Sequence, residues 1–169
     1  MSKNRLYFAY DNTINYRDMA RLCPEAELVA PVHLDGYELV FWDSSANIVR
    51  RDGSSVPGVV WSIPAEYEHT LAWIYHSPVM RKKIEITVAD PGSKQSYTAI
   101  AYAKDARWKD PVPPTAVYFG SMMEGYCRNG LDTRPLFEAY EQTQRELNRQ
   151  LGWGFPEQEK SKKHRQKER

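Results

Sequence analysis

Short apolar runs and alternating patterns dominate the hydrophobic positions of this chain. The alternation is clearest at residues 82–88, where every second residue from Ile84 is apolar and the others are polar or charged, so a half-buried strand is predicted there. Turn-forming residues bound the other apolar runs. Strands are predicted from these runs at residues 6–9, 28–34, 37–42, 56–63 and 96–103.

Glycine, proline and aspartate mark the predicted connections. The Asp35-Gly36 pair predicts a tight hairpin between the second and third strands. Residues 43–55 are polar and predict a loop or a weak hairpin, and residues 90–92 predict a turn. Residues 111–114 contain three prolines and predict a rigid extended segment.

Helical spacing of apolar residues predicts four helices, at residues 15–23, 64–75, 115–129 and from 133 onward. Gly130 is predicted to end the third of them. The inward faces of the last two helices are predicted to carry Tyr118, Phe119, Met122, Met123 and Tyr126, and then Leu136, Tyr140, Leu147 and Leu151. Strands outnumber helices and neighbouring strands form hairpins, which indicates an α+β fold rather than a doubly wound α/β fold.

Composition places the chain among ordinary globular proteins. Its 169 residues, 41% of them hydrophobic and 27% charged, suit one domain, which is predicted to span residues 1–152. The net charge of +1 gives no reason to expect a nucleic acid or a membrane as partner. Six Lys or Arg residues and three Glu residues fall within 157–169, so residues 153–169 are predicted to form a charged, disordered tail or an arm for an acidic partner.

The two cysteines, Cys23 and Cys127, are too few for a disulfide framework, and no ligand cluster surrounds either of them. Both are predicted to be reduced and buried, which is typical of the cytoplasm. The first residues lack the apolar stretch of a signal peptide, and no apolar run approaches the roughly 20 residues that span a bilayer. The sequence cannot give the oligomeric state.

Residues 7–15 read Tyr-Phe-Ala-Tyr-Asp-Asn-Thr-Ile-Asn. This segment resembles the Tyr-Phe-Ala-Tyr-Gly-Ser-Asn-Leu-Asn opening of the γ-glutamylcyclotransferase-like (AIG2-like) family. Agreement continues in the same order, from about residue 7 to residue 140. The agreeing segments are residues 19–24, 34–39, 58–61 and 125–131.

The resemblance implies a small mixed β-barrel of about six strands with flanking helices. It also implies substrates that carry a γ-glutamyl group and a reaction that releases 5-oxoproline and a free amine, with no metal and no cofactor. In that reaction the substrate's own α-amine attacks its γ-carbonyl, so a base must first remove a proton. Backbone N–H groups must hold the substrate and the developing oxyanion.

Two departures from the family pattern affect this chemistry. The family's glycine-containing loop corresponds to Asp11, Asn12, Thr13 and Ile14, which contain no glycine. The Asp11 carboxylate adds bulk and a negative charge, which should repel a substrate carboxylate unless a cation offsets it. By resemblance, Tyr10 and these four residues are the candidates for binding the substrate.

The second departure removes the acid. The family's catalytic Glu lies in a Leu-Asp-x-x-Glu-Gly pattern, and the same stretch here, residues 71–76, places Tyr75 at the Glu and His76 at the Gly. Tyrosine, whose phenol ordinarily has a pKa of about 10, is a poor base at neutral pH. Residues 70–80 offer no other acid, so the family reaction is predicted to be absent.

Each candidate residue also has a structural interpretation. Tyr75 is either a core ring or a hydroxyl that points into the substrate pocket. His76 is either a base or a surface loop residue. Asp11 and Asn12 either cap the following helix or bind a ligand. Glu124 either faces the mouth of the barrel or is solvated.

Three functions therefore remain open. The first is a repurposed protein, a pseudoenzyme, that binds a small polar or cationic ligand in a pocket lined by Tyr10, Asp11, Asn12 and Tyr75. The second is a cyclotransferase-type enzyme with a relocated base, Asp11 or His76. The third is a protein-interaction module that uses its charged tail.

Overall fold

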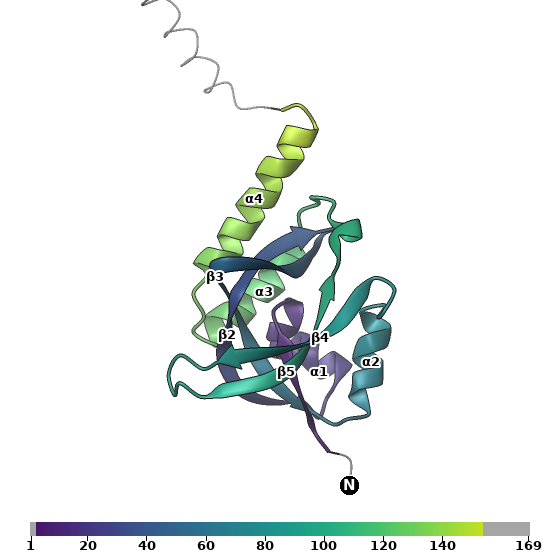
Figure 1. Ribbon diagram of the computed structural model, residues 1–169, viewed down its shortest axis with the longest axis vertical. Coiled ribbons are helices and arrows are strands. Elements are labelled where there is room, and N and C mark those ends of the chain that lie inside the picture. Colours follow the sequence, from purple (N-terminus) through teal and green to yellow (C-terminus); the bar gives the residue numbers. More distant parts are fainter. Residues whose placement is uncertain (1–2, 154–169) are drawn as a thin grey trace, which may run out of the picture.

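The structure, a computed structural model, describes residues 3–153. Within this range five strands close into a barrel in the order β1-β3-β2-β4-β5 (Figure 1). Neighbouring strands pair antiparallel, except that β1 closes the barrel by pairing parallel to β5. The strands are β1 (Arg5–Ala9), β2 (Glu27–Trp42), β3 (Ser45–Ile63), β4 (Arg81–Ala89) and β5 (Ser96–Lys104). The predicted α+β class and mixed barrel are thus confirmed, with five strands in place of about six.

The strand count differs because the predicted hairpin at Asp35 and Gly36 is wrong. β2 continues through both residues, and its register with β3 shifts there because Gly36, at φ 79°, forms part of a β-bulge. The chain reverses instead at Asp43 and Ser44, at φ 49° and 63°. This pair of positive φ angles matches the two-residue turn whose twist suits a hairpin.

Four helices pack around the barrel, close to the predicted positions: α1 (Tyr16–Leu22), α2 (Tyr67–Ile74), α3 (Ala116–Arg128) and α4 (Arg134–Gln150). Two short 3-10 turns, η1 (Asn12–Ile14) and η2 (Ala106–Trp108), were not predicted. Asn15 caps α1 by accepting a hydrogen bond from the Arg17 N–H at 3.0 Å. Gly130, at φ 64°, follows the end of α3 as predicted. None of the described helices is long and apolar enough to cross a membrane.

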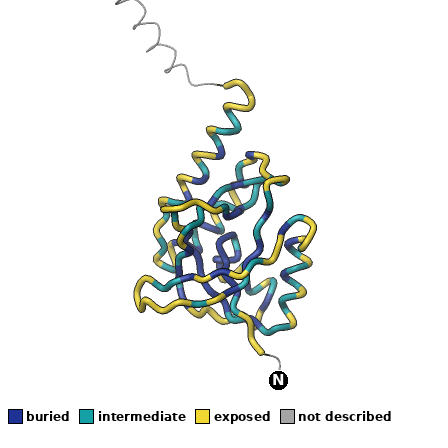
Figure 2. The backbone as a smooth tube through the Cα atoms, in the orientation of Figure 1, coloured by how far each residue is buried: buried dark blue, intermediate teal, exposed yellow. Residues whose placement is uncertain are grey.

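The buried residues gather inside the barrel and around η1, and exposure rises along α4 where it extends away from the barrel (Figures 1 and 2). Met122 and Tyr126 are fully buried, as predicted. Leu151, predicted to lie on an inward stripe, is 53% exposed because it follows the projecting end of α4. Cys23 is buried, but the prediction for Cys127 is wrong: it is exposed, one position along α3 from the buried Tyr126.

Helix α3 fixes η1 through a close contact at Gly125. A Cβ atom at this position would lie 2.7 Å from Ile14 Cγ2 and 2.9 Å from the Asn15 backbone nitrogen. Real Cβ atoms do not approach backbone so closely, so a side chain here would push α3 away from η1. The segment that carries Asp11 and Asn12 therefore depends on a glycine more than one hundred residues along the chain.

Gly125→Ala should lower the free energy of unfolding by about 1–3 kcal/mol, because the added methyl group overpacks the contact between α3 and η1. Gly120→Ala is the matched control, since it lies in the same helix and a Cβ there would meet nothing within 4 Å. The control should be neutral or stabilising, because alanine favours a helix more than glycine does. Urea unfolding of the two variants measures the difference, and equal midpoints would contradict the packing argument.

Candidate functional site

A buried carboxylate lies at the centre of the site. Asp11 follows β1 and is 4% exposed. Its Oδ1 accepts hydrogen bonds from the Thr13 N–H at 2.9 Å and the Thr13 hydroxyl at 2.5 Å. Its Oδ2 accepts from the Tyr75 hydroxyl at 2.5 Å. Asp11 therefore caps η1 and holds the end of α2, whereas the cap of α1 is Asn15; a ligand role for Asp11 stays a prediction.

The Tyr75 hydroxyl belongs to a chain of hydroxyl groups. It lies 2.6 Å from the Tyr7 hydroxyl, which lies 3.0 Å from the Thr13 hydroxyl. Burial, and next the negative charge of Asp11, hold the pKa of Tyr75 well above its usual range. Burial and Asp11 raise the pKa of Tyr7 in the same way. Both phenols therefore keep their protons at neutral pH and serve as donors.

Hydrogen bonds with barrel strand β3 and with helix α1 hold the loop that carries Asp11. The Trp61 indole N–H donates to the Thr13 carbonyl at 3.0 Å, and the Asn12 amide donates to Asp18 at 3.1 Å. None of the residues with positive φ falls between Asp11 and Asn15. The loop thus needs no glycine for its backbone conformation, which is a 3-10 turn of ordinary negative φ.

A cavity of about 260 Å³ opens beside this network. Among the predicted site residues, Asp11, Asn12, Tyr75 and His76 line it, so the structure brings these four together. The structure adds residues that the sequence reasoning missed. They are Asp43, Ser45, Ile74, Met80, Arg81, Lys104 and Tyr118.

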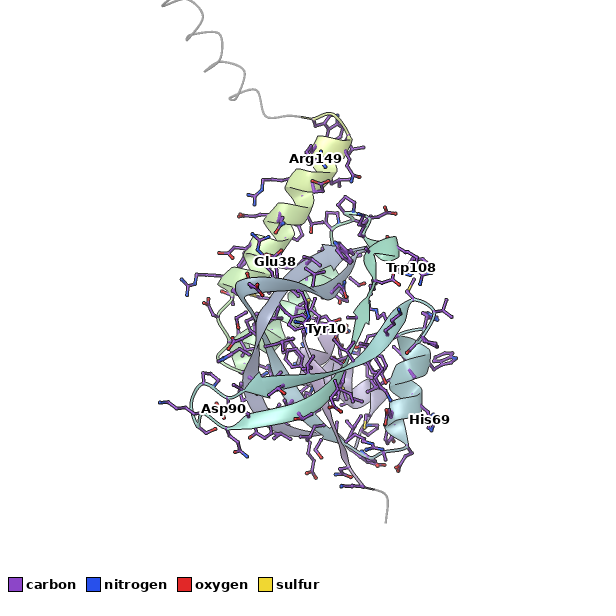
Figure 3. All side chains as sticks on the ribbon, viewed as in Figure 1. Tyr10, Glu38, His69, Asp90, Trp108 and Arg149 are labelled. Atoms are coloured by element: carbon purple, nitrogen blue, oxygen red, sulfur yellow. The ribbon has the colours of Figure 1, made fainter. Side chains whose placement is uncertain are left out.

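Three predicted binding residues do not line this cavity. Tyr10 is buried in the middle of the barrel, where its hydroxyl donates to the Tyr102 carbonyl (Figure 3). Thr13 is buried in the Asp11 network, and Ile14 lies under Gly125. These positions suit residues that shape the loop without lining the cavity. Glu124 is also away from the cavity: it accepts from the Asn15 amide at 3.0 Å and pairs with Arg128 at 3.2 Å.

Two cations also line the cavity. Arg81 begins β4 and Lys104 ends β5, and the two residues are direct cross-strand partners. Each residue is only 6% exposed. Arg81 Nη2 and Lys104 Nζ both donate to the Ser45 hydroxyl oxygen, at 2.9 Å and 2.7 Å. The Arg81 guanidinium also lies over the Tyr75 ring, 4.9 Å from its centroid.

The surroundings of these cations change the acidity of the lysine. Burial, followed by the positive charge of Arg81, lowers the pKa of Lys104 to about 8. The carboxylate of Asp43 acts in the opposite direction and does not cancel the shift. For Arg81, burial alone would lower the pKa, but the neighbouring Tyr10 and Asp11 reverse that effect and raise it. Lys104 therefore loses its charge at a lower pH than an ordinary lysine does.

The donor set of the site does not suggest a metal centre. Among residues 3–153 no group of three or more His, Cys, Asp or Glu side chains is placed to hold a metal ion. The two carboxylates that line the cavity, Asp11 and Asp43, share it with Arg81 and Lys104. A cation at this position would meet the positive charge of both basic residues.

Known structures share this fold. An uncharacterized human protein superposes with a TM-score of 0.73 at 22% sequence identity, over 81% of this chain and 86% of that one. A γ-glutamyl cyclotransferase gives 0.70 at 21% identity, over the same shares of the two chains. A yeast γ-glutamyl cyclotransferase specific to glutathione gives 0.61 at 10% identity, over 84% of this chain and 96% of that one. No protein-family model matches the chain, and no curated protein matches its sequence.

The chain therefore has the γ-glutamyl cyclotransferase fold, and the resemblance seen in its sequence is confirmed at this level. The backbone at His76 supports the residue-by-residue match. His76 has φ 51°, a left-handed conformation that glycine adopts without strain, and the family pattern has glycine at this position. Tyr75, one residue earlier, is the residue that the sequence resemblance aligns with the acid of the pattern. His76 is exposed, at the rim of the cavity.

Tyr75→Phe should lower the free energy of unfolding by about 1–3 kcal/mol, because it leaves the buried Asp11 Oδ2 without its donor. Tyr126→Phe is a matched control. Tyr126 is also fully buried, but its hydroxyl has no hydrogen-bond partner among the described residues. Removing that hydroxyl should be neutral or stabilising. Chemical denaturation compares the two variants, and a Tyr75→Phe variant as stable as the native protein would show that the network contributes nothing.

Proposed function

We propose that this protein binds a small polar ligand in the cavity beside Asp11 and does not carry out the cyclisation of γ-glutamyl compounds. One observation carries the proposal. The position of the family's catalytic acid is occupied by Tyr75, whose hydroxyl donates a hydrogen bond to Asp11 and keeps its proton. A group in this state cannot accept the proton that cyclisation releases from the α-ammonium.

The other candidate bases fit the reaction less well. The two Asp11 oxygens already accept three hydrogen bonds from Thr13 and Tyr75. Three of the roughly four acceptor positions of the carboxylate are therefore taken, which leaves about one for a substrate ammonium. His76 is exposed at the rim, where water competes for its ring. A relocated base therefore remains the alternative, and the binding function is the better supported one.

The charges around the cavity suggest the ligand class. Asp11 and Asp43 contribute negative charge, and Arg81 and Lys104 contribute positive charge. A ligand with both an ammonium and an acidic group would complement such a lining. A γ-glutamyl compound has these groups, and two of the similar structures are named as γ-glutamyl cyclotransferases. The cavity volume of about 260 Å³ suits a small molecule.

The remaining predictions on function stay open. The predicted interaction through the charged tail depends on residues 153–169, of which the structure describes only Trp153. A cytoplasmic location remains a prediction from the cysteine content.

The native protein should release no 5-oxoproline from γ-glutamyl amino acids, γ-glutamyl amines or glutathione, while calorimetry should detect binding of at least one of them. Chromatography of the reaction mixture measures the product. Release of 5-oxoproline by the native protein would contradict the proposal and direct mutagenesis to Asp11, His76 and Lys104. Failure of every compound to bind would contradict the ligand class.

A paired set of variants separates the missing acid from a missing pocket. Asp11→Gly with Tyr75→Glu restores both family residues and avoids placing two carboxylates side by side. Asp11→Gly with Tyr75→Gln has the same shape without the acid. Turnover in the first variant alone is expected if the pocket still holds the substrate and lacks only its base.

A further inference from the structure

The placement of Arg81 and Lys104 is unfavourable unless something compensates for it. Like charges directly opposite each other on paired strands repel, and burial strengthens the repulsion because water no longer screens it. Buried charges in proteins are normally paired with an opposite charge. Within residues 3–153, however, neither Arg81 nor Lys104 has a carboxylate oxygen within 4 Å.

The contacts that the two cations do make are neutral. Both donate to the Ser45 hydroxyl oxygen, and Lys104 Nζ also donates to the Trp42 carbonyl at 2.8 Å. These contacts satisfy some of the N–H groups and leave both charges without a carboxylate in direct contact. Ser45 accepts these two hydrogen bonds, and its own hydroxyl donates to the Trp42 carbonyl in a long hydrogen bond of 3.4 Å. Arg81, Lys104 and Ser45 all line the cavity.

We propose that Arg81 and Lys104, bridged by Ser45, form a subsite that binds an oxyanion of the ligand, a carboxylate or a phosphate group. The proposal deepens the binding function proposed above and rests on it. An anion here would provide a direct counterion for both cations. Charge-assisted hydrogen bonds of this kind are the strong ones in protein sites.

Neighbouring carboxylates do not remove the positive character of this subsite. The charged and titratable groups that line the cavity with Lys104 are Asp11, Asp43, Tyr75, His76, Arg81 and Tyr118. Tyr118 keeps its proton, because burial and next Asp11 raise its pKa. Asp43 favours the charged lysine, but burial and Arg81 outweigh it, since the pKa of Lys104 is lowered. The positive charge of Arg81 thus still acts on the Lys104 amine, and an added anion would be attracted to both cations.

The lowered pKa of Lys104 gives the subsite a pH signature. Below about pH 7 the lysine is charged, and an anion binds to two cations. An anion stabilises the charged amine, so its binding raises the pKa of Lys104. Affinity should therefore be constant below about pH 7 and fall as the pH rises through and above 8. Arginine at position 104 stays charged over this range and should abolish the decline.

The test uses the full chain and two simple probes that do not titrate between pH 6.5 and 9.5. Acetate represents a carboxylate, and sulfate represents a tetrahedral phosphate ester. Binding is followed by amide chemical shifts in NMR titrations of the native protein and of Lys104→Gln, Lys104→Arg and Lys82→Gln. Lys82 is the matched control, because it is an exposed lysine in the strand position next to Arg81.

At pH 6.5 at least one probe should bind the native protein and shift the amides of Ser45 and Lys104. Lys104→Gln should weaken that binding by about tenfold or more, and Lys82→Gln should not. The native affinity should fall by about tenfold by pH 9.5, and Lys104→Arg should retain its affinity. If Lys104→Gln does not fold, the comparison of the native protein with Lys104→Arg across the pH range decides. The probe that binds more tightly identifies the oxyanion.

Several results would overturn the subsite. They are no binding of either probe, equal binding to Lys104→Gln, or a native affinity that does not change with pH. The two proposals fail separately. If a γ-glutamyl compound binds native protein and Lys104→Gln equally, the subsite is wrong and the binding function stands. If the anions bind as expected but no γ-glutamyl compound does, the subsite stands and the ligand class is wrong.

Discussion

The need to satisfy one buried carboxylate organises this site. Asp11 is almost fully buried, and an unpaired carboxylate at such a place would cost several kcal/mol. Its partners come from two places, the η1 turn and the end of α2. The carboxylate therefore joins the first strand to a helix more than fifty residues later. The direction of the Tyr75 hydroxyl and the shape of the cavity both follow from this connection.

The two departures from the family pattern are physically coupled. Where the pattern has glycine in the loop and glutamate after α2, this chain has Asp11 and Tyr75, which share a 2.5 Å hydrogen bond. The site thus has its carboxylate in the loop, at Asp11, and a phenol at the helix end, at Tyr75. A glutamate at position 75 would place a second negative charge in contact with Asp11.

Much of the fold could be predicted from the sequence, because hydrophobic period and capping residues act locally. The β4–β5 hairpin, the four helices and the glycine after α3 all follow from such signals. The failure at Gly36 has a physical reason. A glycine with positive φ serves a bulge as readily as a turn, and only the pairing of β2 with β3 along their whole length distinguishes the two. The predicted burial of Cys127 was wrong because a single helical position separates the buried face of α3 from its exposed face.

The sequence predicted residues of the site only where they belong to the family motif. The resemblance pointed to Asp11, Asn12, Tyr75 and His76, and these four line one cavity. Arg81 and Lys104 were missed because each looked like an ordinary charge at the end of a strand. A signal was present: antiparallel pairing of the two predicted strands places their outer ends together. The sequence could not show that α2 and the Asp43–Ser44 turn bury the end of β4 at Arg81 and the end of β5 at Lys104.

The charged groups of the cavity differ in their hydrogen-bond partners, and this difference favours binding over catalysis. The Asp11 carboxylate accepts three hydrogen bonds from donors of its own chain. A base needs a free lone pair that points at its substrate, and Thr13 and Tyr75 occupy most of the acceptor positions of Asp11. Arg81 and Lys104, by contrast, have only neutral hydrogen-bond partners among the described residues. These two residues thus present positive charge to the cavity, and positive charge attracts a ligand without removing its proton.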